Sequence, residues 1–206
     1  MDKKEKWLDM AIELQGLAQA GLAYTDNVYD IERYERIRDI SAEMIAMNCD
    51  LPKETVKSLF CNESGYQTPK LDTRAAIFKD GKILLVREKS GRWSLPGGWV
   101  DVDLSIGENA VKEVREESGL DVTCDRIIAV QDRKKHNLPV YAHNICKIFF
   151  LCSIVGGEFR ENSETTESRY FGEDELPELS EEKNNAEQIK MCFEAYRSED
   201  WTVRFD

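Results

Sequence analysis

The chain has 206 residues, of which 41% are apolar, 28 are Lys or Arg and 40 are Asp or Glu, so the formal net charge is −12. This length allows one large domain, or one domain with a smaller appendage. Nucleic acid is an unexpected partner for so acidic a chain, because phosphate contacts dominate nucleic-acid binding. A small phosphorylated substrate remains compatible with this charge if metal ions and a few local cations offset the repulsion.

The apolar runs and the cysteines indicate the cellular compartment of the protein. No apolar run approaches the roughly 18 residues that a membrane span requires, and the amino-terminal MDKKEKWLDM lacks the apolar region of a signal peptide. We therefore expect a cytoplasmic protein with no membrane association. The six cysteines show neither C-x-x-C nor Cys/His metal spacing, which indicates free, buried thiols rather than a zinc site.

The segment 3–60 has the periodicity of helices. The first helix is expected to stop at Gly21, the second to cover about 27–47 with Asp26 or Asn27 as its cap, and a short third one to follow. So few helices cannot enclose a core alone. Their apolar faces are expected to pack on the following domain or on a second copy of the chain.

A polar segment, CNESGYQTPK, separates these helices from the rest of the chain. It contains Gly65 and Pro69, which break helices, and it changes the character of the sequence. We place the domain boundary here, with a helical subdomain over 1–62 and a second domain over 63–206.

Strand patterns dominate the second domain. TRAAIFK and KILLVRE flank Asp80-Gly81, which predicts a two-residue hairpin because both turn positions tolerate positive φ. The apolar run HNICKIFFLCSIV, 143–155, is expected to be a central strand, and an amphipathic helix is expected over about 182–197. Mixed strands with a few helices predict an α/β or α+β fold with a mixed sheet.

Three carboxylates gather near the end of another predicted helix. The stretch 95–122, LPGGWVDVDLSIGENAVKEVREESGLDV, joins a glycine turn to a helix that carries Glu113, Glu116 and Glu117 and stops at Gly119. Their spacing places the three carboxylates in one sector of the helix. The helix dipole penalises each anion there by roughly 0.3–1 kcal/mol, so a divalent cation bound by oxygen ligands would neutralise the cluster. Charge alone also allows a solvated acidic face.

The stretch fits a longer pattern, G-x5-E-x7-R-E-U-x-E-E-x-G-U with U aliphatic, from Gly98 to Leu120. On these residues the chain resembles the Nudix hydrolases over roughly 70–200. The resemblance implies an α/β (α+β) fold in which a mixed sheet is sandwiched by helices. It also implies hydrolysis of a phosphoanhydride by water attack at phosphorus, with Mg²⁺ or Mn²⁺ as cofactor.

Two positions depart from this family pattern. Leu104 stands where a glutamate is expected, and Lys112 stands where an arginine is expected. In the family these two residues help to fix the loop and orient the metal-binding helix, so the support of the loop is left open. Glu108 lies four residues before Lys112 and is a candidate local partner for it.

The amino-terminal segment narrows the resemblance. WLDMAIELQGLAQAGLAYTDNVYDIERYERIRDIS, followed by GYQTPKLDTRAAIF, resembles a subgroup of bacterial Nudix enzymes that split nucleoside diphosphates linked to another group, such as ADP-ribose or CDP-choline. The implied substrate is a small nucleoside diphosphate derivative. The subgroup also implies a homodimer formed through the helical segment.

The resemblance assigns candidate roles to residues of this chain. The implied metal ligands, of which the glutamates are also catalytic candidates, are Gly97 through its carbonyl, Glu113, Glu116 and Glu117. The general base is left open between a glutamate of the pattern and two later residues, Glu164 and Glu167, each of which can equally be a solvated loop carboxylate.

Candidate substrate-binding residues come from several segments, and they are Arg74, Arg87, Gly98, His136 and Tyr141. Arg87 can equally be an exposed strand charge. Tyr141, Trp93 or Trp99 can stack on a base, although aromatic residues at strand ends usually pack in the core or at an edge.

Two alternative functions remain open at this point. A nucleoside triphosphate or RNA 5′-end pyrophosphohydrolase would be expected to show a basic path for a longer substrate, and none is evident. A catalytically weak nucleotide-binding sensor is the other alternative, and Leu104 is the sequence argument for it.

Overall fold

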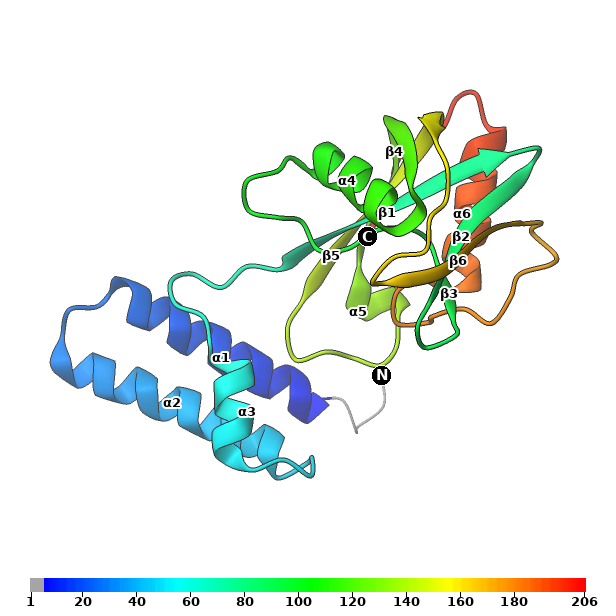
Figure 1. Ribbon diagram of the computed structural model, residues 1–206. Helices are drawn as coiled ribbons and strands as arrows, with labels where there is room; N and C mark the ends of the chain where they lie inside the picture. Colours follow the sequence, from blue (N-terminus) through cyan, green and yellow to red (C-terminus); the bar gives the residue numbers. More distant parts are fainter. Residues whose placement is uncertain (1–5) are drawn as a thin grey trace. The chain divides into compact units, whose positions relative to one another are not determined.

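The computed structural model describes residues 6–206, which form two compact units (Figure 1). The first unit ends at Pro69, and the second is Lys70–Asp206. Across the described residues, no helix has both the length and the apolar character needed to cross a membrane.

The first unit consists of α1 (Lys6–Tyr24), α2 (Val28–Ala46) and α3 (Lys53–Phe60). Asn27 caps α2, because its side chain accepts a hydrogen bond of 2.9 Å from the N–H of Tyr29. The predicted stop at Gly21 is wrong, since α1 runs on to Tyr24. A Cβ at Gly21 would lie 2.4 Å from the ring of Tyr34, so this glycine lets α2 approach α1 closely rather than ending the helix.

The polar segment after α3 lies with the helices. The Gln19 side chain donates to the Gly65 carbonyl at 2.9 Å, and Arg38 donates to the Cys61 carbonyl at 2.5 Å. These bonds hold the segment against α1 and α2. The first compact unit therefore ends later than the expected boundary at residue 62.

The second unit is built on one mixed sheet. Its strands are β1 (Lys70–Lys79), β2 (Lys82–Glu88), β3 (Trp93–Ser94), β4 (Leu120–Asp132), β5 (Ile145–Gly157), β6 (Thr165–Phe171) and β7 (Arg204–Phe205). The order is β3-β2-β1-β5-β4-β7, and β6 also pairs with β2. The central place of β5 is confirmed. The hairpin is confirmed too, because Asp80 and Gly81 have φ values of 51° and 72°.

Helices cover both faces of this sheet, which confirms the predicted fold class. α4 (Ile106–Ser118) packs Ala110 and Val114 on one face, and α6 (Ala186–Arg197) packs Ile189 and Phe193 on the other. Figure 1 shows the two helices on opposite sides of β1. Neighbouring β1 residues supply the two cores, as expected from the alternation of side chains along a strand. The one-turn helix α5 (Arg133–His136) and β7 have no counterpart in the predicted elements.

Candidate active site

The ends of α4 follow from local chemistry. Ser105 accepts a hydrogen bond from the N–H of Glu108, and the Glu108 carboxylate accepts one from the N–H of Ser105. Gly119 ends the helix with a φ of 71°. Glu108 is therefore committed to the start of the helix and is not the partner of Lys112.

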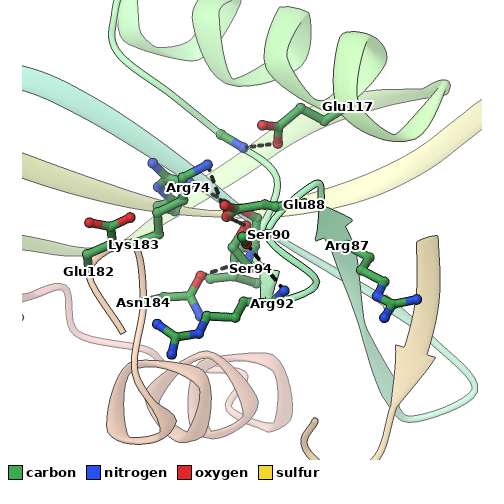
Figure 2. Close-up of polar contacts among 12 residues, drawn as sticks. Arg74, Arg87, Glu88, Ser90, Arg92, Ser94, Glu117, Glu182, Lys183 and Asn184 are labelled. Atoms are coloured by element: carbon green, nitrogen blue, oxygen red, sulfur yellow. Dashed lines mark hydrogen bonds and ion pairs between the residues drawn. The ribbon is translucent and has the colours of Figure 1, made fainter. Parts of the chain in front are cut away.

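Glu117 is held against the glycine turn. Its carboxylate accepts a 2.9 Å hydrogen bond from the N–H of Gly97, as Figure 2 shows. Gly97 has a φ of 146°, and a Cβ there would lie 1.9 Å from the Thr73 carbonyl oxygen, so no side chain fits. The Glu117 side chain is buried, and burial raises the pKa of its carboxyl to about 7.

Glu113 lies one helical turn earlier on the same buried side of α4. A Cβ at Gly98 would come within 2.6 Å of its carboxylate oxygen, so the second glycine of the turn also makes room for a carboxylate. Burial raises the pKa of Glu113, and the charges of Glu116 and Glu164 add to the rise. Two buried carboxylates therefore flank the Gly97-Gly98 turn.

Glu116 differs from the other two carboxylates. Its side chain is 52% exposed and lies 3.1 Å from the Lys112 ammonium. Among residues 6–206, no three His, Cys, Asp or Glu side chains converge closely enough to form a ready-made metal site. The structure thus brings Glu113 and Glu117 together at the turn, and the Lys112 ammonium contacts both Glu116, at 3.1 Å, and Glu113, at 3.3 Å.

Asn109 and Lys112 support the loop between the glycine turn and α4. The buried Asn109 side chain accepts from the N–H of Asp101 at 3.1 Å and donates to the Thr73 hydroxyl at 3.0 Å. Lys112 lies 3.1 Å from the Asp101 carboxylate. Sequence reasoning missed Asn109, although an asparagine inside a helix is unfavourable by propensity and is a signal of another role.

The two candidate bases have different surroundings. Glu164 precedes β6, where the Thr165 hydroxyl donates to the Glu117 carbonyl at 2.5 Å, and its charge acts on Glu113. Glu167 lies on β6, opposite Arg87 in the strand register, and forms ion pairs with Arg87 and Arg169. The charge of Glu164 therefore acts on Glu113, whereas Glu167 is engaged by two arginines.

A cavity of about 140 Å³ lies in the second unit. Its lining residues are Asp72, Arg74, Trp99, Arg133, Tyr141, Ile145, Lys147, Glu182 and Lys183. Arg74 binds Asp72 with two hydrogen bonds, of 2.9 and 2.7 Å, and its positive charge opposes the rise of the Glu117 pKa. Arg74 therefore links this cavity to the buried carboxylates.

Two family models match this chain. Residues 5–60 match the model described as "UDP-X-like, N-terminal oligomerisation domain", and residues 69–192 match the model of the NUDIX domain. The chain belongs to the Nudix hydrolase family.

Three similar proteins show which Nudix hydrolases this chain resembles. A protein of Bacillus subtilis, provisionally named as an ADP-ribose pyrophosphatase, is 44% identical over 98% of this chain and 97% of its own length. A crystal structure of an ADP-ribose pyrophosphatase from Streptococcus suis is 56% identical and has a TM-score of 0.64, covering 68% of this chain and 100% of that one. The crystal structure of a UDP-X diphosphatase is 33% identical, with a TM-score of 0.64, and covers 98% of this chain and 100% of its own.

The predicted substrate-binding residues of the hydrolase fall into separate places. Arg74 and Tyr141 line the cavity, and Gly98 borders Glu113. Figure 2 shows Arg87 extending away from the group around Arg74, and His136 lies 2.7 Å from the Asp206 carboxylate. The structure does not bring Arg87 or His136 into the cavity.

The aromatic candidates for base stacking also lie in different environments. Trp93 is 7% exposed and packs edge-on against Phe171 in the core. Trp99 is 54% exposed and lines the cavity together with Tyr141. A stacking role for Trp93 is therefore wrong, whereas Trp99 and Tyr141 stay in place for one.

Two buried cations of the cavity were missed by sequence reasoning. Lys147 donates to the carbonyls of Glu182 and Lys183, and burial lowers the pKa of Lys147 to about 7. A single lysine inside the apolar run ICKIFFLC is a signal that could have found it. Arg133 is 3% exposed, and its guanidinium lies 3.5 Å from the centroid of the Tyr141 ring. No local pattern marks Arg133, whose partners are Pro139 and Tyr141 in the following loop and Glu182 far along the chain.

Proposed function

We propose that this Nudix hydrolase cleaves the pyrophosphate bond of a nucleoside diphosphate linked to another moiety, and that it requires Mg²⁺ or Mn²⁺. The observation that carries the proposal is the pair of buried carboxylates, Glu113 and Glu117, held against the Gly97-Gly98 turn. The names of the relatives, ADP-ribose pyrophosphatase and UDP-X diphosphatase, support the substrate class.

The residues present fit a divalent cation. Carboxylate oxygens are ligands that Mg²⁺ and Mn²⁺ prefer, and the raised pKa values of Glu113 and Glu117 indicate buried negative charge that is incompletely compensated. The Gly97 carbonyl is a further candidate ligand. Glu116 is another one, provided that it leaves Lys112. When bound, the ion supplies charge neutralisation for the phosphate oxygens.

Other side chains of the hydrolase have roles that follow from their positions. Arg74 carries a positive charge that acts on Glu117, because a guanidinium does not deprotonate in proteins. Asp72 holds this guanidinium in place through two hydrogen bonds. Glu164 is the candidate to accept the proton of the attacking water, since it lies near Glu113 on a segment fastened to the end of α4. Glu167 is already engaged by two arginines.

Phosphate release in the presence of a coupled phosphatase tests the proposal. The substrates are ADP-ribose, CDP-choline, UDP-glucose and the common nucleoside triphosphates, each with MgCl₂, MnCl₂ or EDTA. We expect turnover of diphosphate derivatives, weak turnover of triphosphates and loss of activity in EDTA. Absence of turnover on every pyrophosphate, with tight nucleotide binding retained, would overturn the enzymatic proposal in favour of a sensor.

We also infer a homodimer formed through the first unit. Met10, Leu17 and Tyr24 recur every seven residues along α1 and are 51%, 62% and 79% exposed, so they form one apolar stripe. The amino-terminal family model is described as an oligomerisation domain, which supports covering this stripe with a second copy.

A further inference from the structure

We propose that the Lys112 ammonium competes with the divalent cation for the carboxylates of Glu113 and Glu116, so that this lysine lowers the metal affinity of the site. The inference rests on the proposed function, because it concerns the affinity of the same metal site. Its starting point is the set of contacts that one side chain makes.

Lys112 contacts three carboxylates at once. Its ammonium nitrogen lies 3.1 Å from the Asp101 carboxylate, 3.3 Å from that of Glu113 and 3.1 Å from that of Glu116. An ammonium has three N–H donors and no acceptor, so these carboxylates suffice to engage all of its donors. Glu113 and Glu116 are also candidate metal ligands. The ammonium therefore binds two of the groups that a divalent cation would use.

Electrostatics makes the two kinds of binding antagonistic. An ammonium and a divalent cation that share a carboxylate repel each other. The favourable free energy that Lys112 gains from Glu113 and Glu116 is lost when the ion displaces it. Both effects act in the same direction, and each weakens the binding of the divalent cation.

The ammonium has a second partner that is not a candidate ligand. Lys112 is 35% exposed, and the Asp101 carboxylate that it contacts is 53% exposed. The lysine side chain is a flexible four-carbon stem with a compact charge. It is therefore able to leave the two glutamates while its charge stays beside Asp101 and water, which makes the exchange reversible.

The support of the loop does not depend on Lys112 alone. Asn109 accepts from the N–H of Asp101 and donates to the Thr73 hydroxyl, and these contacts stay in place when Lys112 moves. The two possible roles of Lys112 therefore predict effects of opposite sign. If the lysine holds the glutamates in position for the ion, its removal weakens metal binding, whereas removal of a competitor strengthens it.

Calorimetric titration with Mn²⁺ measures this sign directly. We would compare the wild type with Lys112→Met, which removes the charge from a partly exposed position and keeps a helix-forming side chain. The Kd for Mn²⁺ should fall about tenfold, which corresponds to about 1.4 kcal/mol, the scale of two partly exposed ion pairs. An unchanged or higher Kd in Lys112→Met would overturn the inference.

Two further variants separate the contacts of Lys112 from its charge alone. Arg115→Met removes an equal charge from the same helix, but Arg115 is 74% exposed and pairs with Asp121. Its Kd for Mn²⁺ should change by less than about twofold in moderate salt. Lys112→Arg keeps the charge and should bind Mn²⁺ as weakly as the wild type. Equal gains in Arg115→Met and Lys112→Met would contradict the competition.

A crystal structure of the unmodified protein with Mn²⁺ needs no variant to fold. We expect the Lys112 ammonium to lie more than about 4 Å, the limit of an ion pair, from the glutamate oxygens that bind the ion. An ammonium that keeps its contacts with both Glu113 and Glu116 beside the bound ion would overturn the inference.

Hydrolysis assays on the same proteins separate this inference from the proposed function. Tighter Mn²⁺ binding by Lys112→Met supports the competition even if no pyrophosphate is hydrolysed, a result that would count only against the enzymatic proposal. An unchanged Kd with hydrolysis intact would remove the competition and leave the enzyme. Absence of Mn²⁺ binding in both proteins would overturn the competition together with the metal requirement.

Discussion

Burial of the Glu117 carboxylate costs the metal-free protein stability. Burial raises its pKa from 4.5 to about 7, and each pKa unit corresponds to about 1.4 kcal/mol. The shift therefore amounts to roughly 3 kcal/mol when the group is ionised. Side chains selected for stability alone would not leave this charge here, and a cation bound beside it would recover the loss.

We expect Glu117→Gln to stabilise the metal-free protein at alkaline pH. The folded-state pKa of Glu117 lies above the unfolded value, so its contribution is fully present below pH 4.5 and is lost as the pH rises through about 7. In EDTA at pH 8 the variant should exceed the wild type by up to roughly 3 kcal/mol in free energy of unfolding. The difference should vanish near pH 4.5, as measured by urea denaturation.

Glu116→Gln is the control for this experiment, because its carboxylate is half exposed, and it should show no comparable gain. Saturating Mg²⁺ should stabilise the wild type and have little effect on Glu117→Gln. Parallel pH profiles of the wild type and Glu117→Gln in EDTA would show that the burial of this carboxylate does not govern stability.

The choice of general base is decided by a second pair of substitutions. Glu164→Gln should lower kcat by about 100-fold or more, the usual effect of removing a positioned base, with KM nearly unchanged. Glu167→Gln should stay near the wild-type rate, since Glu167 is paired with Arg87 and Arg169 on β6. Initial rates at saturating Mg²⁺ provide the measurement, and near-wild-type turnover of both variants would remove this segment from the mechanism.

At the scale of elements, α4 is oriented by contacts with the strand beneath it. Asn109 connects the helix to Thr73 on β1 and to the backbone of Asp101 in the preceding loop. Lys112 reaches the side chain of Asp101 as well. These contacts provide support to a loop that has Leu104 where the family has a glutamate.

Asn109→Ala should loosen this loop. The substitution removes the partner of the buried Thr73 hydroxyl and of the Asp101 N–H, which is expected to cost about 1–3 kcal/mol in free energy of unfolding and to weaken Mg²⁺ binding. Urea denaturation and Mg²⁺ titration measure the two effects. Asn144→Ala, at an exposed asparagine, is the control, and equal behaviour of the two variants would mean that Asn109 does not support the loop.

Local chemistry determines which elements the sequence predicts. The Asp80-Gly81 hairpin and the helix end at Gly119 depend on the φ preferences of the residues themselves, and the structure confirms both. The role of Gly21 depends on Tyr34, a residue of the next helix, so the same type of signal was misleading there. α5 and β7 have four and two residues, too few for a period to be recognised.

The candidate site, too, could be predicted from the sequence only in part. The family pattern identifies Glu113, Glu116 and Glu117 together, but whether a carboxylate points inward depends on the packing of α4, which spacing alone does not reveal. Arg133 and Lys147 depend on contacts with the segment before α6. Such contacts join residues that are distant in sequence, so their functional environment is visible only in the folded chain.

At the scale of the whole molecule, the chain divides its functions between two compact units. The second unit contains the buried carboxylates and the cavity. The first unit leaves Met10, Leu17 and Tyr24 largely exposed. Exposed apolar stripes on helices are typical of interfaces between chains, which makes association the expected role of this unit.

We expect Leu17→Glu to convert the proposed dimer to monomers. The side chain is 62% exposed in the single chain, so the substitution should change the stability of the isolated fold by less than about 0.5 kcal/mol, whereas a charge buried in an interface is strongly unfavourable. Sedimentation velocity at micromolar concentration measures the effect. Val155→Glu, at an exposed apolar residue of the second unit, should remain dimeric. A monomeric wild type, or a Leu17→Glu protein that stays dimeric, would contradict the assignment of the interface to α1.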